Sequence, residues 1–130
     1  EAYFLDYAEK ARAKSRVPMV VTGGFRSGAA MRGALESGAT DLIGMARPLA
    51  VCPDFPNRLL ADPESTVTLG RPSTGSKFLN RMAMLDVTWY ETQLDRMARG
   101  LPPDPNLGAW PAVFQMLGRA GAYALLPRRA

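Results

Sequence analysis

Two pairs of neighbouring residues in this sequence have the chemistry needed to hold a phosphate group. Gly23-Gly24 directly follow an apolar run, and glycines let a ligand reach backbone N–H groups because they have no side chain in the way. Ala46-Arg47 end a second apolar run, and an arginine guanidinium donates charge-assisted hydrogen bonds to phosphate oxygens. Alone, Gly-Gly after a strand is commonly a tight turn, and a lone arginine is commonly a surface residue. Together, the four residues favour a phosphate-binding site.

The elements that would position these residues follow from hydrophobic periodicity and from helix-capping residues. The pattern predicts a helix over 2–15, a strand over 17–21, a helix over 28–37 capped by Ser27, and a strand over 41–45. This order predicts an α/β unit with parallel strands and a right-handed crossover. The first strand shows no alternation of apolar and polar residues, which predicts burial on both faces. Because the carboxyl ends of neighbouring parallel strands lie side by side, both residue pairs would meet at one end of the sheet, and the start of the helix over 28–37 would add N–H donors.

The rest of the chain is predicted to be mainly helical. Asp54 can cap a short helix that ends near Leu60, and residues 62–76 are rich in Pro, Gly, Ser and Thr, which indicates an irregular connection. A single long helix is predicted over 77–99 and a shorter one over 109–121. The long helix would present an apolar stripe made of Phe78, Met82, Leu85 and Trp89.

Composition excludes several classes of function. The 130 residues are 47% hydrophobic and 22% charged, as in one modest globular domain or part of a larger one. The net charge of +4 comes from dispersed arginines, so we expect no nucleic-acid partner, and no apolar run approaches the roughly 20 residues that span a membrane. Cys52 is the single cysteine and histidine is absent, so we expect no metal site, no activated nucleophile and a reducing cytoplasm. We expect Cys52 to be buried or half-buried.

Two stretches resemble a known family. VPMVVTGGFRS and GATDLIGMARPLAVCPDFPNRLL, which lie between Val17 and Leu60, are similar to the C-terminal barrel segment of the old yellow enzyme family, also called the NADH:flavin oxidoreductase or NADH oxidase group. The resemblance implies a (β/α)8 TIM barrel that binds FMN without a covalent bond. Residues 1–61 would form its last two βα units, and residues 62–130 an irregular linker with a helical extension.

The resemblance also implies which residues bind the cofactor. The backbones of Gly23, Gly24, Ala46 and Arg47 would hold the FMN phosphate, with the Arg47 side chain near the flavin. The family usually has glycine where this chain has Ala46. If Ala46 had a positive φ, its Cβ would cost about 1 kcal/mol.

For the intact enzyme, the resemblance implies transfer of a hydride from NADH or NADPH through the flavin to an activated alkene, another small-molecule acceptor or oxygen. The family's catalytic side chains lie on earlier strands, so we expect no catalytic residue here and no activity from this chain alone. The sequence begins at Glu1 within a helical pattern, which suggests a fragment of a longer polypeptide.

Two other interpretations stay open. A sugar-phosphate isomerase or synthase built on a TIM barrel would also end two strands with small residues, although the Arg-Pro pair at 47–48 disfavours it. Alternatively, the chain is a catalytically inert fragment that associates with itself, burying its open strand edges and the Trp89 stripe. Under each of these interpretations we expect no binding to membranes, and we expect a homo-oligomer or a strand edge that the C-terminal helices cover.

Overall fold

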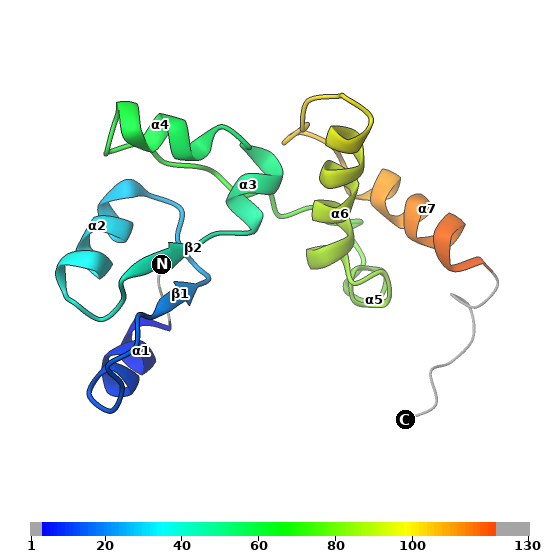
Figure 1. Cartoon of the computed structure of the whole chain (residues 1–130). Helices are drawn as coiled ribbons and strands as arrows, with labels where there is room; N and C mark the ends of the chain where they lie inside the picture. Colours follow the sequence, from blue (N-terminus) through cyan, green and yellow to red (C-terminus); the bar gives the residue numbers. More distant parts are fainter. Residues whose placement is uncertain (1–3, 122–130) are drawn as a thin grey trace. The chain divides into compact units, whose positions relative to one another are not determined.

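The computed structural model of the chain describes residues 4–121, and it divides the chain into two compact units, Glu1–Leu69 and Gly70–Ala130. The first unit contains α1 (Leu5–Arg12), β1 (Val20–Thr22), α2 (Gly28–Glu36), β2 (Leu42–Gly44), α3 (Arg47–Val51) and α4 (Phe55–Ala61) (Figure 1). The second contains α5 (Lys77–Met82), α6 (Leu85–Ala98) and α7 (Ala109–Ala120). Within the described residues, no helix is long and apolar enough to span a bilayer.

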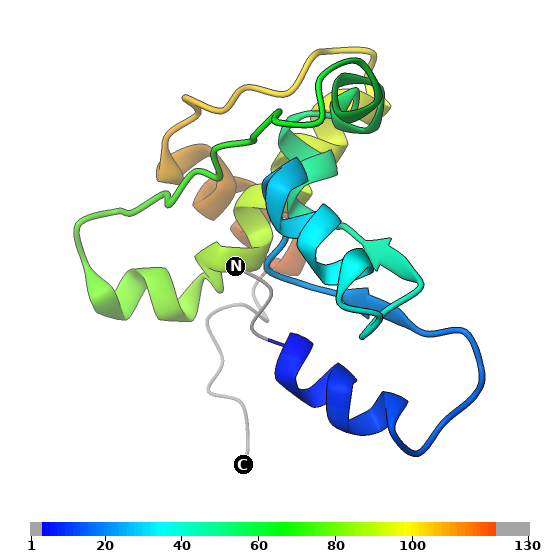
Figure 2. The same ribbon diagram turned by 90° about the vertical axis from the view of Figure 1, so that its left-hand side faces the viewer.

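The two strands of the first unit pair in parallel, as the sequence predicts. The ladder joins Val20 to Leu42, Val21 to Ile43 and Thr22 to Gly44. The intervening helix α2 lies beside the strands in both views (Figures 1 and 2). The predicted order of helix, strand, helix and strand is therefore confirmed, although each strand is shorter than predicted.

Only one face of this small sheet is covered. Val21 is 6% exposed and belongs to a core with Ala8, Phe25, Met31, Ala34, Ala39 and Phe55. Side chains alternate across a strand, so the neighbours of Val21 point the other way. There Val20 is 57% exposed and Leu42 is 58% exposed. The prediction that the first strand is buried on both faces is wrong for the described residues.

An ion pair fixes the starts of the two strands. The Asp41 carboxylate accepts a hydrogen bond from the Met19 N–H at 2.7 Å and pairs with the Arg12 guanidinium of α1. Arg12 also donates to the carbonyls of Gly38 and Val17. The Met19 N–H, and after it Arg12, lower the pKa of Asp41 below its ordinary value. This cluster ties α1 to the segments that lead into both strands.

The ends of α2 follow from its capping residues. Ser27 Oγ accepts a hydrogen bond from the Ala30 N–H, which confirms the predicted N-cap. At the other end, Gly38 has a φ of +72°, a conformation that favours glycine and stops the helix. Both signals were readable in the sequence, and the helix ends within one residue of its predicted bounds.

The irregular segment after α4 is held against the start of α2. The Gly28 N–H donates to the Ser65 carbonyl at 3.0 Å, and the Val67 N–H donates to the Arg26 carbonyl at 2.8 Å. A Cβ at Gly28 would lie 1.9 Å from the Pro63 carbonyl oxygen, so only glycine fits there. Residues 62–67 therefore pack closely on the first turn of α2.

The single long helix predicted over 77–99 is wrong, because the chain turns between α5 and α6. Met84 has a φ of +44°, in the left-handed region that a non-glycine residue rarely adopts. The Thr88 hydroxyl donates to the Ala83 carbonyl at 2.9 Å and so satisfies the end of α5. The break separates the predicted stripe: Phe78 is 70% exposed, whereas Trp89 is 1% exposed.

Helix α6 holds the loop that leads into α7. The indole N–H of Trp89 donates to the Leu107 carbonyl at 2.8 Å. The buried Gln93 amide donates to the Asp104 carbonyl and accepts from the Asp104 N–H, at 3.0 and 2.8 Å. These bonds position α7, and its bounds of Ala109–Ala120 confirm the predicted last helix.

Candidate phosphate-binding site

The predicted site residues leave the sheet at the same end. The parallel ladder finishes at the pair Thr22 and Gly44, so the next residues of each strand, Gly23-Gly24 and Met45-Ala46-Arg47, begin from neighbouring positions. The structure thus brings both predicted loops to one end of the two strands. Whether they bind a phosphate stays a prediction.

The Gly23-Gly24 loop has a backbone that requires glycine. Gly23 has a φ of +118° and Gly24 a φ of +83°. Both values are disfavoured for residues with a Cβ, and both residues are half-buried. The loop can therefore present bare backbone to a ligand, and a side chain at either position would strain it.

The second loop has no such strain. Ala46 has a φ of −124°, so its Cβ does not carry the energetic cost that a positive φ would have brought. The side chains of Ala46 and Arg47 are exposed. Helix α3 begins at Arg47, with Pro48 in its first turn, and the sequence analysis missed this helix. Its signal was Pro48, since proline is common at the first positions of helices.

The start of α2 contributes less to the site than predicted. Of its N-terminal N–H groups, that of Gly28 donates to the Ser65 carbonyl and that of Ala30 to Ser27 Oγ. Donors paired within the chain are not available to an anion. The prediction that the start of α2 offers unpaired N–H groups is therefore wrong for Gly28 and Ala30, and the proposal below relies on the two loops.

Gly44 and Thr22 support the site and were missed by the sequence analysis. A Cβ on Gly44 would lie 1.9 Å from Thr22 Oγ1 and 2.9 Å from Thr22 Cβ. The Thr22 side chain therefore occupies the space beside Gly44 at the last rung of the ladder. A glycine inside an apolar strand pattern, as in Leu42-Ile43-Gly44, is the sequence signal for such a close approach.

The remaining polar groups serve other purposes. Helix α4 begins after Asp54, as predicted. The Asp54 carboxylate, however, accepts a hydrogen bond from the Asn57 side-chain amide and caps no backbone N–H. Cys52 is half-buried and free, as expected. Within residues 4–121, no cluster of three or more His, Cys, Asp or Glu side chains could hold a metal ion.

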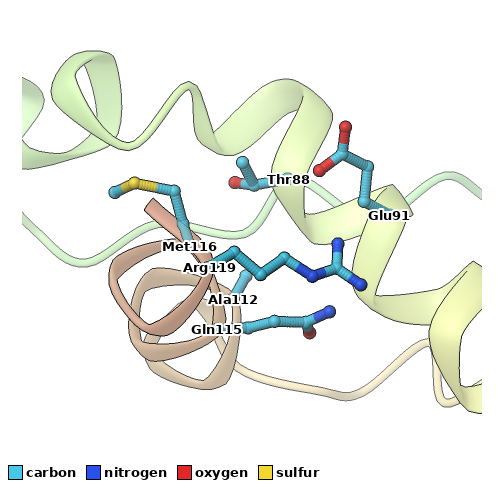
Figure 3. Close-up of a pocket in the computed structure, with 6 residues that line it drawn as sticks. All are labelled: Thr88, Glu91, Ala112, Gln115, Met116 and Arg119. Carbon is cyan, nitrogen blue, oxygen red and sulfur yellow. The ribbon is translucent and has the colours of Figure 1, made fainter. Parts of the chain in front are cut away.

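A small pocket lies between α6 and α7 in the second unit. Figure 3 shows its lining residues, with Arg119 extending from α7 toward α6: Thr88, Glu91, Ala112, Gln115, Met116 and Arg119. Arg119 and Gln115 both donate to the Asp95 carboxylate of α6. Two polar side chains that line the pocket, Gln115 and Arg119, thus link α7 to α6.

Comparison with known proteins finds relatives among flavin enzymes. The chain is 33% identical over 102 residues to the NADH-dependent flavin oxidoreductase iliE of Hypocrea jecorina (strain QM6a), a match that covers 75% of this chain and 25% of that protein. The chain is related to the NADH:flavin oxidoreductase family. It is also 46% identical over 65 residues to the NADH-dependent flavin oxidoreductase iccE of Talaromyces variabilis, covering 49% of this chain and 16% of that protein. These matches confirm the family resemblance seen in the sequence.

The similarity to these NADH:flavin oxidoreductases is confined to part of each relative. A third one, the NADH-dependent flavin oxidoreductase iliE of Neonectria sp. (strain DH2), is 40% identical over 67 residues, which are 51% of this chain and 9% of that protein. The matched segments therefore span a quarter or less of the length of each of these three relatives. No family model and no solved structure matches the chain.

Proposed function

We propose that this chain supplies the FMN phosphate-binding end of a flavin oxidoreductase that takes a hydride from NADH or NADPH. One observation carries the proposal: the two strands pair in parallel, and their ladder ends at Thr22 and Gly44. The loops with Gly23-Gly24 and Ala46-Arg47 therefore follow from neighbouring strand ends. The relatives support the chemistry, since each is named an NADH-dependent flavin oxidoreductase. The proposed location is the cytoplasm.

Each residue of the site has its own proposed role. Gly23 and Gly24, with positive φ values, turn their backbone toward the phosphate without a side chain in between. Ala46 is small enough to let the phosphate approach the second loop. The exposed Arg47 guanidinium donates charge-assisted hydrogen bonds to the phosphate oxygens. When bound, FMN supplies the hydride acceptor and donor, and these residues only hold and orient it.

The proposed setting is a (β/α)8 barrel completed by further strands. Parallel strands occur almost only in sheets that are covered on both faces. The exposed Val20 and Leu42 side chains belong to the face that such a barrel would turn inward. A phosphate site at the ends of its last two strands agrees with the usual position in such barrels. The proposal assigns substrate binding and catalysis to the rest of such a protein, so this chain alone would be inactive.

Flavin fluorescence titration tests the proposal, because FMN and riboflavin differ only in the phosphate. We expect the 130-residue chain to bind FMN more tightly than riboflavin, and inorganic phosphate to compete. A hydrogen bond to a charged group contributes about 1.5–3 kcal/mol, so Arg47→Ala should weaken FMN binding about 10- to 100-fold and leave riboflavin binding unchanged.

The matched control is Arg58→Ala, which removes another exposed arginine, on α4. This variant should bind FMN like the unchanged chain. Equal affinities for FMN and riboflavin, or equal losses in the two arginine variants, would contradict the proposed phosphate site.

A further inference from the structure

The exposed face of α7 is apolar and aromatic. Trp110 is 48% exposed and Phe114 is 65% exposed, and their ring centroids lie 6.0 Å apart. Pro111 and Gly118 are also exposed, and Leu117 is half-buried. Contiguous apolar surface of this kind on a helix commonly marks an interaction site.

The opposite face of α7 packs within the second unit. Ala109, Ala112 and Val113 are buried. The single charged residue of the helix, Arg119, pairs with Asp95 of α6. The aromatic face therefore carries no charged side chain of its own.

We propose that this face binds the same face of a second copy of the chain, in an antiparallel pair with a two-fold axis at Phe114. Trp110 and Gly118 lie four residues on either side of Phe114, about 6 Å along the axis. The two-fold operation would place each Trp110 opposite the other copy's Gly118. In the same way it would place Pro111 opposite Leu117.

This pairing matches large side chains with small ones. A Cβ at Gly118 would meet no atom within 4 Å, so the surface is open there and can accept an indole ring. Since the face is uncharged, no like charges meet when two copies pair. Isologous contacts need this kind of self-complementary surface.

The size of the face predicts a weak dimer. An aromatic side chain buries roughly 150–250 Å² when it is fully covered. Here about half of Trp110 and a third of Phe114 are already covered. Two copies would then bury well under the roughly 1,200 Å² of a stable interface. We expect a dimer that forms with rising concentration and that does not depend on flavin.

Sedimentation velocity of the full 130-residue chain over a range of concentrations tests the inference. Phe114→Glu would place two carboxylates at the axis, and we expect the dimer dissociation constant to rise at least about tenfold. Val87→Glu is the control, because Val87 is 53% exposed on α6 and lies outside the face. It should leave the dissociation constant unchanged. Far-UV circular dichroism should show the same helix content in both variants.

A charge exchange tests the antiparallel register. Trp110→Glu and Gly118→Lys should each weaken self-association when studied alone. Mixed together, they should form a heterodimer, because Glu at 110 of one copy would meet Lys at 118 of the other. A mixture of Phe114→Glu and Gly118→Lys should form less heterodimer than the mixture of Trp110→Glu and Gly118→Lys, because residues 114 and 118 do not face each other in the proposed pair.

Three results would overturn the inference. The first is a chain that stays monomeric at every concentration, and the second is self-association that Phe114→Glu leaves unchanged or that Val87→Glu weakens equally. The third is binding of the chain to phosphatidylcholine–phosphatidylglycerol vesicles through Trp110 and Phe114 without any self-association, which would assign the face to a lipid surface.

Discussion

Replacing Gly28 by alanine tests how the segment after α4 packs on α2. The new Cβ would lie 1.9 Å from the Pro63 carbonyl oxygen and 2.9 Å from Leu59 Cδ2. The nearer of these atoms belongs to the backbone, so relief requires residues 62–67 to move away and their hydrogen bonds to Gly28 and Arg26 to lengthen. Overpacking of this kind costs about 1–3 kcal/mol of unfolding free energy.

Gly33→Ala is the matched control, since the same substitution in the same helix meets no atom within 4 Å. Alanine favours helix over glycine by about 0.5–1 kcal/mol at an exposed interior position. Urea unfolding followed by circular dichroism should therefore show Gly28→Ala destabilised and Gly33→Ala stabilised. If Gly28→Ala equals or exceeds the stability of the unchanged chain, residues 62–67 do not pack on α2 as described.

Three further predictions concern the strands and the second unit. Gly44→Ala should lower the free energy of unfolding in urea by about 1–3 kcal/mol, because the new Cβ would lie 1.9 Å from Thr22 Oγ1. Adding Thr22→Ala should recover part of that loss: it removes Oγ1 but keeps the Cβ of residue 22 at 2.9 Å. The folded-state pKa of Asp41 is lowered, so its carboxylate stabilises the fold above its ordinary pKa, and this contribution is lost as pH falls through the lowered folded-state pKa. Thermal unfolding of Asp41→Asn should therefore depend less on pH in that acid range than thermal unfolding of the unchanged chain does. Gln93→Leu leaves both backbone groups of Asp104 without their partner, so unfolding in urea should show a loss of about 1–3 kcal/mol, and a loss below 0.5 kcal/mol would contradict the importance of this clamp.

The elements around the site could be predicted because each has a local signal. Ser27 and Gly38 mark the two ends of α2, and the apolar runs before Gly23 and Ala46 mark the strands. These signals depend on backbone conformation and capping within a few residues. The parallel pairing followed from the helix between the strands.

The errors arose where contacts distant in the sequence decide the structure. Nothing near Met84 indicates a helix break, since the apolar spacing continues from Phe78 through Trp89. The break lets Trp89 reach the carbonyl of Leu107, 18 residues away. Likewise, the burial of one strand face depends on which elements cover it, and the apolar run around Val20 does not reveal this.

The reduced role of the α2 start in the candidate site has the same cause. The sequence shows a glycine, a cap and a helix, which together favour an anion site. The structure shows that Ser65 already accepts from Gly28. Residues 62–67 were predicted only as an irregular connection, so their packing on α2 could not be foreseen.

Amide chemical-shift mapping by ¹⁵N NMR tests the central claim most directly. In the labelled chain, adding FMN or inorganic phosphate should shift the amide signals of Gly23, Gly24 and Arg47, whereas riboflavin should not. The amide of Gly33, on the exposed surface of α2, should stay unchanged. Shifts concentrated on Arg119 and the pocket between α6 and α7, with none at Gly23, Gly24 and Arg47, would contradict the account.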